Sequence, residues 1–150
     1  MRSKGFTLLE LMVVLAIAAT MMTLVPPMIS SALPGAQLKA TSRQLAAGLR
    51  LARNRALIQR EPASLVLDLA KRRYQVTGLG RSHTIPEGIE VNLLTADSEL
   101  LGEQQGGIRF FPEGGSTGGR ITLSNGKRAF AVDVDWLTGK VRIFEVEPDT

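Results

Sequence analysis

Apolar residues are concentrated at the start of the chain. From Phe6 to Ile29 the only ionisable side chain is Glu10, whereas charged residues occur throughout the later sequence. About 20 apolar residues in a helix span roughly the 30 Å hydrocarbon core of a bilayer. The pattern therefore predicts a transmembrane helix over residues 6–29, followed by a globular domain over residues 30–150.

Two prolines, Pro26 and Pro27, lie near the end of this apolar segment. A proline inside a helix removes a hydrogen bond and either kinks the helix or stops it. The sequence allows both a kinked, continuing helix and a helix that ends at Val25. Leu33-Pro34-Gly35 is a second group of helix-breaking residues.

A second helical pattern, amphipathic in character, covers about residues 36–60. Apolar side chains recur there at steps of 7, 4, 3 and 4 residues, which places them on one helical face. These residues are Leu38, Leu45, Leu49, Ala52 and Ala56. Thr41 fills the gap in this stripe, so we expect the face to pack on a sheet.

Arginines fall largely on the other faces of the same helix. Arg43, Arg50 and Arg53 form a candidate basic contact face for DNA, anionic headgroups or a neighbouring subunit. A solvated helix face explains them as well. No aromatic residue alternates with the arginines, which weakens the case for single-stranded nucleic acid.

Short alternating runs over about residues 63–147 predict antiparallel β-sheets. Seven strands are expected, at 64–69, 73–77, 88–93, 108–111, 120–123, 129–134 and 140–146. The first two form a hairpin, and Asn125-Gly126 is a strong hairpin signal between the fifth and the sixth. The amphipathic helix supplies an apolar partner for the sheets, so the fold class is α+β.

The composition excludes several kinds of site. The 150 residues include no cysteine, so disulfides, thiolate metal sites and cysteine nucleophiles are ruled out. The net charge is +4, of which Arg2 and Lys4 supply two, so a chain cut after Gly5 would carry 4 − 2 = +2. That balance alone is not typical of a nucleic-acid-binding protein.

Enzymatic activity is not expected, because no arrangement of base and nucleophile is visible. His83 is the only histidine and lies in a polar loop, where a solvated surface position is expected. The glycine-rich segment 111–119 lacks the Lys-Ser/Thr ending of a phosphate-binding loop and leads into a strand. We expect a turn there, and Trp136 is expected to anchor the core or a sheet edge.

Acidic residues near the C-terminus suggest two readings. The side chains of Asp133, Asp135, Glu145 and Glu147 could form a calcium site. Alternating acids on exposed strand faces explain them equally well, and this interpretation is favoured. We therefore expect no metal and no cofactor.

The N-terminal segment has two simple explanations, a cleaved signal peptide and a plain membrane anchor. In the first, Leu8–Leu15 is the apolar region and Ala16-Ile17-Ala18 the cleavage site. Both leave Glu10 unexplained, since an acid inside a bilayer costs a few kcal/mol unless it is paired or interfacial.

The sequence from Lys4 to Glu10, KGFTLLE, resembles the class III signal of type IV pilins and type II secretion pseudopilins. The resemblance implies that residues 1–5 are a leader, that prepilin peptidase cuts between Gly5 and Phe6, and that Phe6 is then N-methylated. It also implies that Glu10 is the residue that recruits the subunit into a filament.

Electrostatics supports this role for Glu10. After cleavage, Phe6 carries an ammonium group, and Glu10 of one subunit can meet the Phe6 ammonium of a neighbour when apolar helices pack side by side. Removing one partner of a buried ion pair costs about 3–5 kcal/mol. The acid is therefore a poor choice for a lone helix in lipid and a sensible one between helices.

A second resemblance lies in FFPEGGSTGGRITL and VDVDWLTGKV, which are similar to segments of the H-type minor pseudopilins, the GspH/FimT family. It implies a pilin-like fold, a long hydrophobic helix continuing into an amphipathic helix on antiparallel sheets. It also implies a structural subunit of the type II secretion pseudopilus that supports protein export across the outer membrane.

The expected partners are other pseudopilins, prepilin peptidase, the inner-membrane secretion platform and secreted cargo. Arg2 and Lys4 precede the apolar segment, which predicts a single-pass protein with a cytoplasmic N-terminus, and the resemblance implies that the membrane is the bacterial inner membrane and that the domain is periplasmic. The alternative is a FimT-like minor type IV pilin that binds DNA for uptake. The acidic segment 144–149 argues against it, so nucleic acid is not an expected partner.

Overall fold

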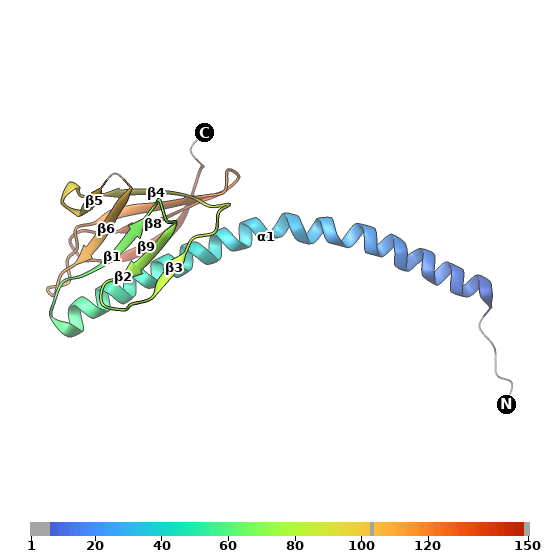
Figure 1. The fold of residues 1–150 in the computed structure, drawn as a ribbon, viewed down its shortest axis with the longest axis horizontal. Helices are drawn as coiled ribbons and strands as arrows, with labels where there is room; N and C mark the ends of the chain where they lie inside the picture. The colour runs from blue at the N-terminus through green and yellow to red at the C-terminus, as the bar shows by residue number, and fades with distance from the viewer. Residues whose placement is uncertain (1–6, 103, 149–150) are drawn as a thin grey trace, which may run out of the picture. The chain divides into compact units, whose positions relative to one another are not determined.

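The computed structural model describes residues 7–102 and 104–148. The chain divides into two compact units, residues 1–34 and 35–150. Helix α1, Leu8–Gln59, contributes to both units (Figure 1). It continues through Pro26 and Pro27, so the alternative in which the helix ends at Val25 is wrong. Pro26 and Pro27 each remove one backbone donor from the helix, and α1 continues across both of them.

In the first unit, the apolar side chains at positions 8–22 are exposed. No helix within the part of the chain that the structure describes is both long and apolar enough to cross a membrane. Side chains at positions 8–22 are all exposed, including Leu8 at 77% and Met22 at 80%. Covering such side chains with lipid or with a neighbouring protein is favourable, because it removes apolar surface from water.

The second unit holds the sheets, with nine strands among the residues described. The strands are β1 (Ala63–Asp68), β2 (Arg73–Val76), β3 (Ser82–Thr84), β4 (Glu90–Thr95), β5 (Leu100–Gly102), β6 (Gln105–Phe110), β7 (Gly119–Ser124), β8 (Ala129–Val134) and β9 (Val141–Val146). A short 3-10 helix, η1 (Asp97–Glu99), precedes β5. The first sheet has the order β3-β2-β1-β6-β5 and the second β4-β7-β8-β9.

Every strand pairing in the two sheets is antiparallel, and both predicted hairpins are confirmed. In the first hairpin, the last pair before the turn is Asp68 of β1 with Arg73 of β2. In the second, it is Ser124 of β7 with Ala129 of β8. Gly126 in the second hairpin has a φ of 79°, which glycine adopts without strain. The α+β class predicted from the sequence is therefore correct.

Strands β3 and β5 and helix η1 are absent from the sequence-based prediction. Each contains three residues, and the side chains of both strands are all exposed. Such short, solvated segments show no alternation of polar and apolar residues. Strands β3 and β5 form because β2 and β6 are available to pair with them, and not because of the sequence of each strand itself.

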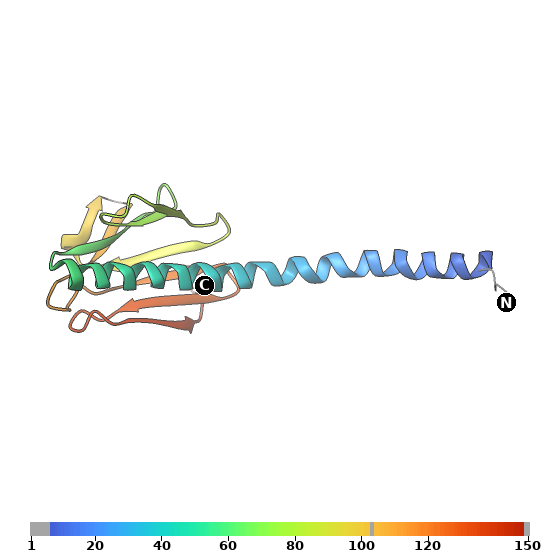
Figure 2. The same ribbon diagram turned by 90° about the horizontal axis from the view of Figure 1, so that it is seen from below.

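The predicted apolar stripe of α1 is confirmed. Its five members, Leu38, Leu45, Leu49, Ala52 and Ala56, are fully buried. Thr41 and Ser42 are buried beside them, and their hydroxyls donate to the carbonyls of Gln37 and Leu38, both at 2.9 Å. Figure 2 shows this part of α1 lying across both sheets, so the core forms between one helix and two sheets.

The helix approaches the first sheet closely at Gly48. A Cβ atom there would lie 3.1 Å from Leu65 Cδ1 and 3.3 Å from Tyr74 Cε2. A larger side chain would push the helix away from β1 and β2, because core packing leaves little free space. Gly48 therefore has a packing role.

Candidate functional site

The N-terminal motif begins at the first described residue, Thr7. Its Oγ1 accepts a hydrogen bond from the backbone N–H of Glu10 at 3.3 Å, and its carbonyl accepts one from the N–H of Leu11 at 3.2 Å. Thr7 is therefore the N-cap of α1. The Glu10 carboxylate is exposed and projects from the first turn of the helix. Gly5 and Phe6 lie outside the described residues.

The capping role of Thr7 was missed from sequence, although Thr-x-x-Glu is the signature of a capping box. One half of that motif, the bond from the Glu10 N–H to the Thr7 hydroxyl, is present. An acid in the first turn also interacts favourably with the helix dipole. Glu10 thus fits the start of this helix as well as the pairing expected from the sequence.

The structure separates the three arginines of the candidate basic contact face. Arg50 Nη2 donates to the Val141 carbonyl at 3.5 Å, and Arg53 Nη2 donates to the Thr138 carbonyl at 3.1 Å. Arg43 is exposed and makes no hydrogen bond or ion pair within the described ranges. Arg53 therefore lies against the connection between β8 and β9, Arg50 lies against the first residue of β9, and Arg43 contacts neither.

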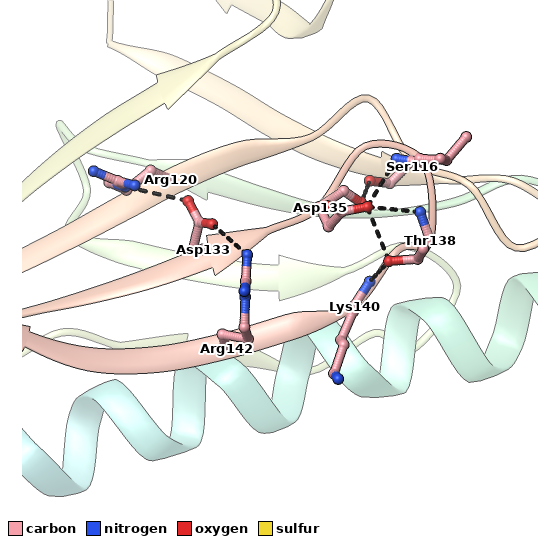
Figure 3. Close-up of polar contacts among 8 residues, drawn as sticks. Ser116, Arg120, Asp133, Asp135, Thr138, Lys140 and Arg142 are labelled. Atoms are coloured by element: carbon pink, nitrogen blue, oxygen red, sulfur yellow. Dashed lines mark hydrogen bonds and ion pairs between the residues drawn. The ribbon is translucent and has the colours of Figure 1, made fainter.

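That connection, residues 135–140, is a tight turn organised by Asp135 (Figure 3). The Asp135 Oδ1 accepts hydrogen bonds from the N–H of Leu137 at 3.1 Å, the N–H of Thr138 at 2.8 Å and the Thr138 hydroxyl at 2.9 Å. The bonds from the backbone and hydroxyl of Thr138 lower the pKa of Asp135 below its usual value. The Asp135 N–H also donates to the Lys140 carbonyl at 3.0 Å.

The glycine-rich loop, residues 111–118, packs on this turn. The Ser116 N–H donates to the Trp136 carbonyl at 2.8 Å, and the Ser116 hydroxyl donates to the Asp135 carbonyl at 3.0 Å. Gly139 has a φ of 63°, and a Cβ there would lie 2.6 Å from the Gly114 carbonyl oxygen. The loop and the turn, which belong to the two segments that carry the second resemblance, are therefore in contact.

A pocket of about 520 Å³ opens between α1 and the turn. It is lined by Arg50, Arg53, Asn54, Thr138, Gly139, Lys140 and Val141, with no acidic residue among them. In Figure 3 the Lys140 side chain extends from the turn towards α1. Arg53 Nε is buried and has no hydrogen-bond partner. The pocket is therefore basic and can bind an anionic group.

Trp136 does not anchor the core or a sheet edge, so that prediction is wrong. The residue lies in the turn and its side chain is 67% exposed, as is that of Leu137 at 66%. The hydrogen bonds of Asp135 fix the turn so that both side chains point away from the core. Trp136 thus lies on the surface, two residues before Thr138, which lines the basic pocket.

The C-terminal acids take part mainly in ion pairs and in the turn. Asp133 lies between Arg120, at 3.2 Å, and Arg142, at 3.7 Å (Figure 3). Arg128 pairs with Glu145 at 2.7 Å, and its hydrogen bond lowers the pKa of Glu145. Within residues 7–102 and 104–148 no group of three or more acidic, histidine or cysteine side chains could hold a metal ion.

His83 is exposed, as predicted, and stacks on Tyr74 with ring centroids 5.1 Å apart. The hydroxyl-bearing residues described above serve the helix and the turn: Thr41 and Ser42 bond within α1, and Ser116 and Thr138 bond to the turn. These contacts are structural.

Sequence families agree with both resemblances. The family model described as Type II transport protein GspH matches residues 41–138, and that of the Prokaryotic N-terminal methylation motif matches residues 1–26. Type II secretion system protein H of Xanthomonas campestris pv. campestris is 34% identical over 139 residues, which cover 93% of this chain and 82% of that protein.

Solved structures show the same fold at low identity. The minor pseudopilin EpsH of Vibrio cholerae has a TM-score of 0.57 and 14% identity, covering 73% of this chain and 97% of EpsH. The type IV minor pilin FimU of Pseudomonas aeruginosa has a TM-score of 0.53 and 16% identity, covering 74% and 93%. The pilin-like fold is thus confirmed, and the family match over residues 41–138 shows that this chain belongs to the GspH family of type II transport proteins.

Proposed function

We propose that the protein is a minor pseudopilin, a structural subunit of the type II secretion pseudopilus that supports export across the outer membrane. The observation that carries this proposal is the presence, in one chain, of an N-terminal methylation motif and a GspH domain. The first motif belongs to subunits that are processed and assembled, and the second is the globular part of the subunit.

Processing by prepilin peptidase is the first step of the proposed function. The enzyme cuts between Gly5 and Phe6 and methylates the new N-terminus. Residues 6–29 then anchor the subunit in the inner membrane, with the N-terminus in the cytoplasm and residues 30–150 in the periplasm. The two basic residues of the leader, Arg2 and Lys4, support this orientation.

Assembly follows through Glu10. Its carboxylate pairs with the Phe6 ammonium of an adjacent pseudopilin once apolar helices surround both groups. The exposed apolar side chains at positions 8–22 support such packing, because they present a continuous surface for neighbouring helices. The partners of the subunit are other pseudopilins, the inner-membrane secretion platform and exported cargo.

A DNA-binding role of the FimT kind receives less support from the structure. Three arginines, Arg120 and Arg142 in the second sheet and Arg128 in the turn before β8, are already paired with acids. The C-terminal segment after β8 also carries Glu145 and Glu147. Binding to a DNA duplex requires many unpaired cations along its phosphates, and the charges of these arginines are already neutralised by acids.

The experiment that tests the proposal is complementation in a host that lacks its own copy of this subunit. The wild-type chain should restore secretion and should have a mass that begins at Phe6. Gly5→Ala should remain uncut in the membrane and should fail to restore secretion. Normal cleavage and secretion with Gly5→Ala would refute the proposed processing and with it the assignment.

A further inference from the structure

We propose that the basic pocket between α1 and the turn 135–140 binds a short acidic peptide segment of a neighbouring subunit, with Trp136, an exposed residue of the same turn, as the apolar anchor. This inference rests on the proposed function, because it names the chemistry of a partner in the same assembly. The pocket places Arg50, Arg53 and Lys140 around one hollow together with the amide of Asn54.

The positive charge of this pocket is not compensated within the described part of the chain. None of its three cationic side chains forms an ion pair with an acid there, whereas the arginines on the second sheet do. The nearest acid in sequence, Asp135, directs its Oδ1 to its own turn. A carboxylate that enters the pocket would meet cations without displacing an existing partner.

The two arginines are held in position before any ligand binds. They lie three residues apart on α1; Arg50 Nη2 donates a hydrogen bond to the carbonyl of Val141, the first residue of β9, and Arg53 Nη2 donates one to the Thr138 carbonyl in the turn. A guanidinium has five N–H donors, so donors remain for a carboxylate. Arg53 Nε is buried without a partner, which adds an unsatisfied donor near the pocket. Such preorganisation lowers the entropy lost on binding.

Trp136 adds an exposed apolar side chain to the turn that carries the basic pocket. Its side chain is 67% exposed although the backbone around it is fixed by Ser116 and Asp135. Leu137 beside it is 66% exposed. Tryptophan and arginine are the residues most often found at the energetic centres of protein interfaces. The ligand is therefore a peptide that carries carboxylates next to an apolar side chain.

A peptide fits this surface better than a nucleic acid does. Binding to a phosphate backbone relies on a track of many cations, and its affinity grows with the number of phosphates neutralised. Here three uncompensated cations surround a single concave site of about 520 Å³. That geometry suits one or two carboxylates.

The test uses the fluorescence of Trp136, the only tryptophan in the chain, as a reporter at the site. The full chain in detergent micelles is titrated with a synthetic Glu/Leu peptide, with the same peptide carrying Gln for Glu, and with a DNA oligonucleotide. We expect a saturable emission change with the Glu peptide only. Lys140→Glu should weaken that binding about ten-fold, as the loss of one charge-assisted contact implies.

Lys127→Glu is the matched control. Lys127 is also an exposed lysine in a β-turn whose backbone N–H bonds to a side-chain oxygen, and it lies outside the pocket. It should bind the Glu peptide as the wild type does. Equal binding by wild type and Lys140→Glu, no response to the Glu peptide, or tighter binding of DNA would each overturn the proposal.

The same samples separate this inference from the proposed function. The mass of each purified chain reports cleavage after Gly5, which does not depend on the pocket. A processed chain without peptide binding refutes only the docking site. An uncut wild-type chain refutes the pseudopilin assignment.

Discussion

At the scale of single residues, Glu10 combines two kinds of interaction. Its backbone N–H is satisfied by the N-cap Thr7, while its carboxylate remains exposed in the first helical turn. The helix therefore starts well without a partner for the acid. If replacing the Glu10 carboxylate strongly reduces assembly, the cause is therefore a lost contact between subunits and not a damaged helix start.

We predict that Glu10→Leu is cleaved after Gly5 but fails to enter the pseudopilus. The ammonium of the neighbouring Phe6 would be left buried without a partner, at a cost of about 3–5 kcal/mol. The measurement is the amount of the variant that co-sediments with assembled pseudopilins, and Glu147→Leu serves as a control outside the helix. Assembly of Glu10→Leu at the wild-type level would show that the pairing is dispensable.

Asp135 gives the turn a predictable pH dependence. Its hydrogen bonds with Thr138 lower its pKa in the folded protein. A carboxylate with a lowered pKa contributes stability above the pKa of the unfolded chain, about 3.9, and loses that contribution as the pH falls through the folded value. The turn should therefore be intact at neutral pH and loosen in acid.

We predict that the emission of Trp136 changes as the pH falls below about 4, before the second unit unfolds. In Asp135→Asn this acid transition should disappear, because the titrating group is gone. Circular dichroism measured on the same samples distinguishes loosening of the turn from global unfolding. An unchanged acid transition in Asp135→Asn would assign it to another group.

At the scale of elements, periodic segments were predictable from sequence and long-range contacts were not. The buried stripe of α1 and the two hairpins follow from local spacing and turn chemistry. The contact between loop 111–118 and turn 135–140 depends on how β6, β7 and β8 are arranged, which no local pattern reports. For the same reason the exposed position of Trp136 and the basic pocket were not foreseen.

Arg50 and Arg53 illustrate this limit at the candidate site. Sequence placed them with Arg43 on one basic face, but helical position alone could not show that β9 and its preceding turn lie against two of them. The N-terminal motif was predictable because its residues are consecutive. Its processing sites, Gly5 and Phe6, stay predictions.

Two glycines in turns test the contact between the loop and the turn. We predict that Gly139→Ala lowers the free energy of unfolding by about 1–3 kcal/mol, because it strains a positive φ and presses Cβ against the Gly114 carbonyl. Gly126→Ala has a similar positive φ but open space around it, so its loss should be smaller. Thermal denaturation gives both values, and equal losses would show that the close contact is unimportant.

At the scale of the whole molecule, the core lies entirely in the second unit. Every buried apolar side chain among the residues described belongs to positions 35–150. The first unit contributes exposed apolar surface instead. Folding of the globular part should therefore not require the N-terminal apolar segment.

We predict that residues 35–150 alone fold cooperatively. A chain that starts at residue 46 should be much less stable, because it lacks the fully buried Leu38 and Leu45, and each such leucine contributes about 2–5 kcal/mol. Thermal melts followed by circular dichroism compare the two. A missing transition in the longer chain would show that the apolar segment takes part in folding.

Strand β9 has a consequence for a molecule surrounded by copies of similar subunits. It is an outer strand of the second sheet, and Arg142 and Glu145 are among its exposed side chains. Charges on such a strand discourage another chain from adding to its open edge. Without these charges, neighbouring subunits could pair through their sheet edges and aggregate. With them, the subunits associate through their apolar helices instead.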